Sequence, residues 1–405
     1  MTTNHGLRSA VLALTVLAAL AAAPAAGAPT APAEYTDLYA ALDARLTAIE
    51  AIVASRGSGQ AREVTFSAEL LPANANIGEA LFQGQTWPVV LLNLDRLQQL
   101  GVRGVKVAVK YPVLIPAFPR SADYLAFYRR LGDELRRRRL TFLVQMTDGF
   151  REPDVSALPV AGYYAGLTWE RYRREKRQMA ETIINEIRPD YLTVQNEPGT
   201  QAHNTGLPMT VERVTDLLEF VTRGLDKRGT LVGAGAGTWE DLAYVQSMAG
   251  IDALDYLDMH LYPINRDFVL DRAYRFAEVA RRAGKRLVVG EAWLYKIRDQ
   301  ELGGVTVAAA PGNFARDVFS FWEPLDARFV SATVTFARRQ QVEFASFFWS
   351  RYFFGYVEYT DATRRLPPSA LFRLANMAAA RGMASDPPRL TQTGETLRKL
   401  ISSGK

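Results

Sequence analysis

Short apolar or alternating segments recur along the chain and are separated by longer segments whose apolar residues follow helical spacing. Apolar runs bounded by turn residues predict strands, and a period near 3.6 residues predicts helices. The predicted strands lie near Val64–Leu70, Gly104–Tyr111, Leu140–Met146, Tyr191–Asn196, Thr230–Gly235, Leu254–His260, Leu287–Glu291 and Glu343–Trp349. The clearest predicted helices lie near Ser121–Arg139, Thr168–Arg188, Thr210–Lys227, Arg266–Ala283 and Ser369–Arg381.

This alternation of strands and helices determines the expected fold class. Alternating units predict a parallel sheet, and eight of them favour closure into a barrel over an open sheet. The chain has 405 residues, of which 48% are hydrophobic and 22% charged, which is enough for one barrel with a well-buried core. We therefore predict an α/β fold, a (β/α)8 TIM barrel, over residues 61–385.

Shorter segments flank or interrupt the predicted barrel. Apolar residues at helical spacing between Tyr35 and Arg56 predict an N-terminal helical extension, within residues 34–60, that packs on the barrel. Residues 386–405 are polar and predict a short C-terminal tail. The stretch Gly303–Gly312 is expected to form a long loop.

The N-terminus carries the features of an export signal. Arg8 is followed by an uncharged run, Ala10–Ala23, that is rich in leucine, valine and alanine, and Pro24 ends it. A basic start and an apolar run of this length are typical of a secretory signal and too short for a comfortable membrane span. Residues 1–33 are therefore expected to be a signal peptide, cleaved after residue 25, 28 or 33, and the alternative is an uncleaved anchor. We expect a secreted or periplasmic protein without a membrane span in the mature chain.

Composition narrows the possible chemistry. The absence of cysteine excludes disulfides, thiolate metal sites and a cysteine nucleophile. Only three histidines occur, His5, His203 and His260, so neither a metal nor another cofactor is expected. The formal net charge is +5, and the arginine run from Arg136 to Arg139 is typical of a solvated helix end. We therefore expect no nucleic-acid partner, and nothing in the sequence specifies an oligomeric state.

Two predicted strands end in a glutamate. Catalytic groups in α/β barrels project from the carboxyl ends of the strands, which makes such residues candidates for chemistry. One strand ends in Asn196-Glu197-Pro198 and another in Gly290-Glu291. Taken alone, each has an ordinary explanation, a strand-end turn for Glu197 and a helix N-cap for Glu291. Their separation of 94 residues corresponds to three barrel units of about 30 residues. The two acids are therefore expected on strands four and seven, facing each other across the barrel mouth.

A third strand end carries polar residues at alternate positions. Asp258, His260 and Tyr262 share one face of the predicted strand. This pattern fits a hydrated barrel mouth, and the alternative is a core histidine whose hydrogen bonds are satisfied.

Together these positions resemble the signature of the glycoside hydrolases of clan GH-A, the 4/7 superfamily, over about Val64 to Gly355. Asn196-Glu197-Pro198 is similar to the strand-four motif, Glu291 to the strand-seven nucleophile, His260-Leu261-Tyr262 to a strand-six element, and Trp349 to a strand-eight aromatic. The resemblance implies that Glu197 is the general acid/base and Glu291 the nucleophile of a retaining β-glycoside hydrolase.

The second strand departs from the pattern of the clan. Many members carry an arginine near the nucleophile, whereas this strand has two lysines on one face, Lys106 and Lys110. We expect Lys110 to replace the arginine as a point charge, without the planar fork of a guanidinium.

The resemblance further implies a polysaccharide or oligosaccharide substrate, held at the barrel mouth beside His260. Tyr262 is expected to donate to Glu291, and Asn196 to bond the sugar 2-hydroxyl. Stacking faces for sugar rings are expected from Trp349, Trp293 and Trp239. Three alternatives stay open: a non-catalytic glycan-binding barrel, a transglycosylase with the same glutamates, and a metal-dependent barrel hydrolase, which the scarcity of histidine disfavours.

Overall fold

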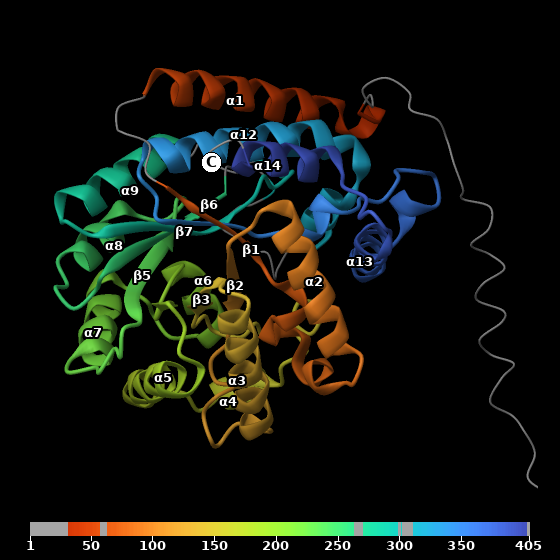
Figure 1. Ribbon diagram of the computed structural model, residues 1–405. Helices are drawn as coiled ribbons and strands as arrows, with labels where there is room; N and C mark the ends of the chain where they lie inside the picture. Colours follow the sequence, from red (N-terminus) through yellow and green to blue (C-terminus); the bar gives the residue numbers. More distant parts are fainter. Residues whose placement is uncertain (1–30, 57–62, 263–269, 299–300, 302–310, 403–405) are drawn as a thin grey trace, which may run out of the picture.

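Eight parallel strands close into a barrel surrounded by helices (Figure 1). The computed structural model describes residues 31–56, 63–262, 270–298, 301 and 311–402. The strands pair in sequence order, and β8 closes the ring against β1. They are β1 (Thr65–Glu69), β2 (Gly104–Ala108), β3 (Thr141–Gln145), β4 (Tyr191–Thr193), β5 (Leu231–Gly237), β6 (Tyr256–Leu261), β7 (Arg286–Ala292) and β8 (Phe344–Phe347). The predicted (β/α)8 fold and all eight strand positions are confirmed.

Helices follow the strands and cover the outside of the barrel. The long helices are α2 (Thr86–Leu100), α3 (Ser121–Arg137), α5 (Trp169–Thr182), α7 (Val211–Thr222), α9 (Leu270–Arg282), α12 (Glu323–Arg339) and α13 (Pro368–Ala384). Shorter ones are α4 (Val160–Tyr164), α6 (Pro198–Thr205), α8 (Leu242–Ala249) and α11 (Pro311–Ala315). The α5 helix continues into a π-helical turn, Ile183–Ile187, so the helix predicted over Thr168–Arg188 is one continuous element of two types.

Inward-facing side chains fill the barrel with an apolar layer and a polar layer. Near the amino-terminal ends of the strands, one apolar cluster inside the barrel consists of Leu143, Tyr191, Tyr256, Val288 and Phe344. Farther toward the carboxyl ends, buried inward positions are polar, including Ser67, Lys106, Thr193, Asp258 and Ser346. The apolar layer closes the bottom of the barrel, so polar chemistry is confined to its carboxyl end.

An additional helix, α1 (Thr36–Ser55), lies across the barrel over α12 (Figure 1). It buries the apolar residues that the spacing identified: Leu38, Leu42, Leu46, Ile49 and Val53. Arg328 of α12 donates to Glu50 at 2.8 Å and to Thr47 at 2.9 Å, which fixes the register of the two helices. Because α12 is covered on its outer side by α1, it buries residues around much of its circumference.

The prediction of a polar C-terminal tail over residues 386–405 is wrong for most of that segment. Gln392–Ser402 forms the helix α14, which packs against α12 beside α1. Leu397 is fully buried there, and Arg338 of α12 donates to the carbonyl oxygen of Leu400 at 2.8 Å. The helix is short and mostly polar, so a single apolar contact stripe gave too weak a signal in the sequence.

Two predicted segments lie largely outside the described residues. They are the export signal, of which residues 1–30 are not described, and the long loop over Gly303–Gly312, of which residues 303–310 are not described. Among the helices of the described ranges, none combines the length and apolar character needed to cross a bilayer.

The docking of α14 generates a stability prediction. Leu397→Ala removes a fully buried side chain and is expected to lower the free energy of unfolding by about 2–5 kcal/mol. Lys399→Ala, at an exposed position of the same helix, is the matched control and should change it by less than about 0.5 kcal/mol. Chemical denaturation measures both, and equal stability of the two variants would contradict the docked helix.

Candidate active site

Glu197 sits in a strained backbone position at the end of β4. The strand gives way to the short helix α6, which begins at Pro198, and Glu197 between them has φ 42° and ψ 65°. A left-handed conformation costs a residue other than glycine roughly 1–3 kcal/mol, and such strain gathers at functional sites. Pro198 cannot extend the strand because it has no N–H to donate, so the chain turns sharply here.

Glu240 holds this turn in place from the neighbouring strand end. Its two carboxylate oxygens accept hydrogen bonds from the backbone N–H of Gly199 at 2.6 Å and of Gly237 at 2.8 Å. The start of α6 is thereby tied to the end of β5, which stabilises the strained conformation of Glu197.

Glu291 faces the barrel mouth because of a β-bulge in β7. Met259 of β6 pairs with Val289 and the next residue, His260, pairs with Glu291, so Gly290 is an extra residue. Val288 points into the barrel, and strict alternation would turn Glu291 outward. The bulge reverses this alternation and re-aims the glutamate inward.

Gly290 also has to be a glycine at this position. A Cβ added there would lie 2.3 Å from both Asp258 Oδ1 and Gln145 Nε2. Its backbone N–H donates to Asp258 Oδ1 at 2.8 Å, which anchors the bulge to β6. Asp258 is thus a structural member of the polar strand face and not a cavity residue.

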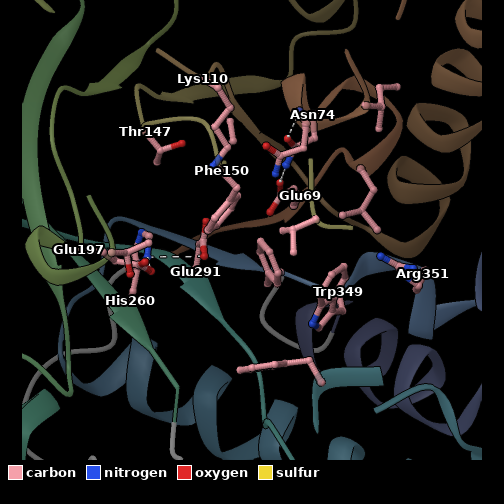
Figure 2. Close-up of a pocket in the computed structure, with 18 of the residues that line it drawn as sticks. Glu69, Asn74, Lys110, Thr147, Phe150, Glu197, His260, Glu291, Trp349 and Arg351 are labelled. Carbon is pink, nitrogen blue, oxygen red and sulfur yellow. Dashed lines mark hydrogen bonds and ion pairs between the residues drawn. The ribbon is translucent and has the colours of Figure 1, made fainter. Parts of the chain in front are cut away.

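The two glutamates meet in one large cavity (Figure 2). Oxygens of Glu197 and Glu291 and a ring nitrogen of His260 lie within 4.8 Å of one another. His260 Nδ1 is 2.5 Å from Glu197 Oε1 and 3.6 Å from Glu291 Oε2, so the imidazole stands between the acids. The cavity of about 850 Å³ exceeds the volume needed for a single sugar ring.

A buried lysine neutralises Glu291 from below. Lys106 Nζ donates to Glu291 Oε1 at 2.6 Å and to Glu69 Oε2 at 2.7 Å, and the Tyr262 hydroxyl donates to Glu291 Oε2 at 2.6 Å. Burial alone would raise the pKa of Glu291, but Lys106 and His260 outweigh burial and lower it to about 2. Glu291 is therefore an ionised carboxylate near neutral pH.

These contacts correct the interpretation of the second strand. The partner of Glu291 is Lys106 and not Lys110, which makes no contact with the carboxylate. Both lysines lie on the inward face, but Lys106 is four residues earlier and pairs in register with Glu69 at the end of β1. Glu69, the acid at that end, went unnoticed in the sequence, although the strand-end criterion applied to β4 and β7 would have selected it.

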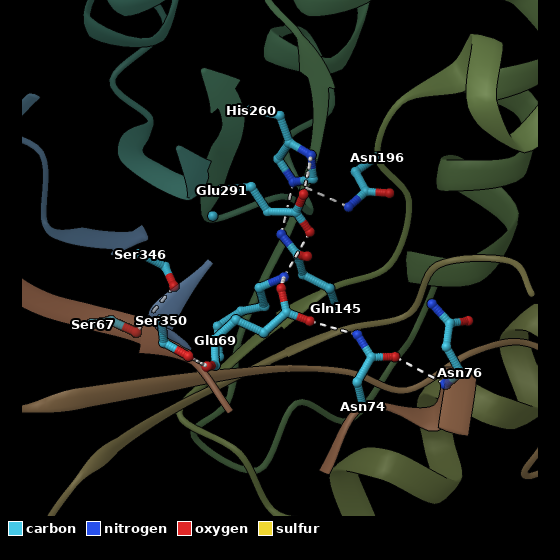
Figure 3. Close-up of polar contacts among 12 residues, drawn as sticks. Ser67, Glu69, Asn74, Asn76, Gln145, Asn196, His260, Glu291, Ser346 and Ser350 are labelled. Atoms are coloured by element: carbon cyan, nitrogen blue, oxygen red, sulfur yellow. Dashed lines mark hydrogen bonds and ion pairs between the residues drawn. The ribbon is translucent and has the colours of Figure 1, made fainter. Parts of the chain in front are cut away.

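Figure 3 shows how Glu69 completes this group. Its second oxygen accepts a hydrogen bond from Asn74 Nδ2 at 2.6 Å, in the loop after β1. Burial and the nearby Glu291 raise the pKa of Glu69, whereas Lys106 and Asn74 lower it, and the net pKa lies above the usual range. Lys106 thus faces one strongly acidic and one weakly acidic carboxyl group.

His260 is held from its other side by two amides. The Gln145 and Asn196 side chains place their nitrogens 2.8 Å and 3.2 Å from His260 Nε2. Burial alone would lower the pKa of His260, but Glu291 and Glu197 outweigh burial and raise it to about 9. Its Nδ1 faces both carboxylates, so each of them stabilises a proton on that nitrogen.

The structure places most of the other expected residues at the cavity wall. Asn196, Tyr262, Lys110, Trp239 and Trp349 all line it. Trp293 is the exception: it is fully buried and packs against Tyr352 and Phe353 at ring distances of 5.5 and 6.4 Å. The expectation that Trp293 offers a sugar-stacking face is therefore wrong, because the segment after β8 covers it.

Further lining residues come from loops that the sequence left unassigned. They are contributed after β1, β3, β5, β7 and β8, and include Asn74, Thr147, Phe150, Glu240, Tyr295 and Arg351. Loop residues carry no periodic pattern, so only the folded chain shows which of them face the cavity.

Glu197, His260 and Glu291 also have the spacing of a three-ligand metal site. Two observations argue against that use among the described residues. The Nδ1 atom of His260 is engaged with Glu197, and the Lys106 ammonium contacts Glu291 directly. A divalent cation would have to share Glu291 with this buried positive charge, which like-charge repulsion opposes.

Comparisons with known proteins agree with the fold. No protein-family model matches the sequence, and no curated protein matches it. A GH5_18 variant from Bifidobacterium longum subsp. longum, in complex with Manb1-4GlcNAc, is similar over 84% of this chain and 78% of its own, with a TM-score of 0.55 and 14% identity. GH5_18 from Streptomyces cattleya, in complex with GlcNAc, is similar over 85% and 80%, with a TM-score of 0.54 and 16% identity. At these identities, the shared feature is the barrel fold.

The buried lysine generates a second prediction. Lys106→Met leaves two buried carboxyl groups without their cation, and the free energy of unfolding at pH 7 should fall by about 3–5 kcal/mol. Lys106→Met combined with Glu69→Gln should recover part of this loss, because one of the two carboxyl groups no longer ionises. Denaturant titration measures both variants.

The stability difference between Lys106→Met and the wild type should depend on pH. The lowered pKa of Glu291 means that its ionised form stabilises the native protein above pH about 4, and that this contribution is lost as the pH falls through about 2. The stability gap between Lys106→Met and the wild type should therefore be widest at neutral pH and close in acid. A gap that stays constant from pH 7 to pH 3 would contradict the ion pair.

Proposed function

We propose that this protein is a retaining β-glycoside hydrolase in which Glu291 is the nucleophile and Glu197 the general acid/base. The observation that carries the proposal is the meeting of these two carboxylates, from the ends of β4 and β7, in one cavity. Their oxygens approach within 4.8 Å. Retaining glycosidases hold their carboxyl groups about 5–5.5 Å apart, whereas inverting enzymes need about 6.5–9.5 Å to fit a water molecule.

The different surroundings of the two acids support different roles. Glu291 contacts the Lys106 ammonium and the Tyr262 hydroxyl, which keep it ionised and aimed for attack. Among the residues that the structure describes, the Glu197 carboxylate has one hydrogen-bond partner, the imidazole of His260. Neighbouring carboxyl groups with unequal environments are the usual arrangement for dividing nucleophile and acid between them.

The reaction follows from these positions in two steps. A Glu291 oxygen attacks the anomeric carbon while the bond to the leaving oxygen breaks, and Glu197 gives its proton to that oxygen. Glu197 then removes a proton from a water molecule, whose oxygen attacks the same carbon and releases Glu291. The proton returns to Glu197, so both acids regain their starting state.

A polysaccharide or oligosaccharide substrate fits the rest of the cavity wall. Trp349 and Trp239 offer ring faces at separate places along it, and Asn196 lies beside the acid pair with its amide 3.2 Å from His260. Aromatic rings stack on the faces of sugar rings, and amide side chains form hydrogen bonds with sugar hydroxyls. The fold neighbour with Manb1-4GlcNAc bound is in keeping with a disaccharide or longer ligand.

Replacement of either acid tests this proposal. Glu197→Gln and Glu291→Gln should each lower kcat on aryl β-glycosides by at least about 10²–10⁴-fold, because a positioned proton donor or nucleophile is lost. Glu152→Gln, at a carboxylate that pairs with His203 outside the acid pair, is the matched control. A panel of aryl β-glycosides identifies the sugar, and wild-type rates in both variants would contradict the assignment.

Azide distinguishes the two roles. In a Glu291→Ala variant, azide takes the place of the nucleophile and should yield the α-glycosyl azide. In Glu197→Ala, azide attacks the glycosyl-enzyme and should yield the β product. Added acceptor sugar separates a hydrolase from a transglycosylase, because the latter forms a new glycosidic product. Sugar binding without any turnover would instead favour a non-catalytic glycan-binding barrel.

We also propose that the protein is exported, on the basis of the basic and apolar sequence of residues 1–33. The mature protein recovered from the extracellular or periplasmic fraction of a bacterial host should begin after residue 25, 28 or 33. Mass spectrometry of the intact chain measures this. A chain that keeps Met1 in the membrane fraction would support an uncleaved anchor instead.

A further inference from the structure

Lys110 is the exception among the buried lysines of the described chain. Lys106, Lys176 and Lys296 are fully buried, and each contacts a carboxylate: Lys106 contacts Glu69 and Glu291, Lys176 lies 3.5 Å from Asp148, and Lys296 contacts Asp326. Lys110 is only 7% exposed, yet it has neither a carboxylate within ion-pair distance nor a hydrogen bond to another described residue.

The Lys110 ammonium faces the cavity described above (Figure 2). Its Nζ lies 4.9 Å from the centre of the Phe150 ring, and Thr147 is nearby on the same wall. Burial is the main cause that lowers the pKa of Lys110, and the charges of Glu291 and Glu69 only partly oppose it. The face of an aromatic ring compensates a buried ammonium less than a carboxylate does.

A second cation at the cavity wall, Arg351, also lacks an ion-pair partner among the described residues. Lys106 below the floor is already paired with Glu69 and Glu291. Arg351, on the opposite wall in Figure 2, lies over the Trp349 ring at 4.2 Å, and its Nε and Nη1 atoms have no hydrogen-bond partner in the described parts of the chain. Cations without an ion-pair partner at a cavity wall attract an anionic ligand.

We propose that Lys110 binds an anionic group carried by the sugar substrate, a carboxylate or a sulfate ester, beside the bond that is cleaved. This inference rests on the proposed function and specifies its substrate class as acidic β-glycosides. An ammonium is a compact point charge with three donors, so it accepts either anion without the geometric selection of a guanidinium. Lys110 would then gain the partner that the other buried lysines find within the protein.

The test compares matched neutral and acidic substrates. The pairs are aryl β-glucoside with aryl β-glucuronide, and aryl β-galactoside with its 6-sulfate. Lys110→Met should lower kcat/KM on an acidic member by about 10–100-fold, the effect of one hydrogen bond to a charged group. The neutral member should change by less than about threefold, since a hydroxyl gains little from the charge. Whichever acidic member responds shows whether the anion is a carboxylate or a sulfate.

Controls separate binding from folding. Lys110→Met removes an unpaired charge, so its midpoint of chemical denaturation should stay at or above that of the wild type, unlike Lys106→Met. Lys110→Arg keeps the charge and should retain the preference for the acidic member. Lys399→Met, on the exposed face of α14, should behave like the wild type.

The outcomes distinguish this inference from the proposed function. Equal losses on neutral and acidic substrates, or a wild-type preference for the neutral members, would overturn the inference and leave the hydrolase standing. If none of the substrates is hydrolysed, calorimetric titration with glucuronic acid, galactose 6-sulfate and glucose tests the anion site directly, because it measures binding without turnover. Binding of an acidic sugar that Lys110→Met abolishes would support the anion site without the hydrolase, and absence of such binding would overturn it.

Discussion

The Lys106 ammonium between Glu69 and Glu291 is the interaction on which the site depends. All three side chains are withdrawn from water above an apolar layer that closes the barrel below them. A carboxylate buried in such a place without a cation would take up a proton. With Lys106 beneath it, Glu291 stays ionised although its side chain is largely buried.

The backbone around Glu197 and Glu291 directs both side chains into the cavity. On one side, Glu197 adopts a left-handed conformation that Glu240 stabilises through two backbone N–H groups. On the other side, an extra residue, Gly290, turns Glu291 from the outer to the inner face of β7. The first is a strained conformation for a residue other than glycine, the second interrupts the alternation of β7, and together they place the acids on either side of His260. The closed barrel fixes the strand ends and so opposes the strain at Glu197.

The charged side chains of the cavity, and not the barrel fold, define its chemistry. The barrel itself is shared with GH5_18 structures at 14–16% identity, so fold alone does not specify a sugar. Within the cavity, Lys106 contacts Glu291 and His260 contacts Glu197, whereas Lys110 and Arg351 have no carboxylate partner among the described residues. The chemistry of the cavity therefore depends on side chains from the strand ends and loops.

The sequence by itself determined the barrel, because eight short apolar strands and their intervening helices leave a periodic record along the chain. It also located Glu197 and Glu291 at strand ends 94 residues apart, since equal barrel units convert spacing into position. Only the tertiary structure decided that Gly290 forms a bulge, that Lys106 and not Lys110 contacts Glu291, that Trp293 is covered, and that α14 docks on α12. Each of these depends on contacts between distant segments, as Lys106 and Glu291 are 185 residues apart. A local pattern of polar and apolar residues carries no information about such register.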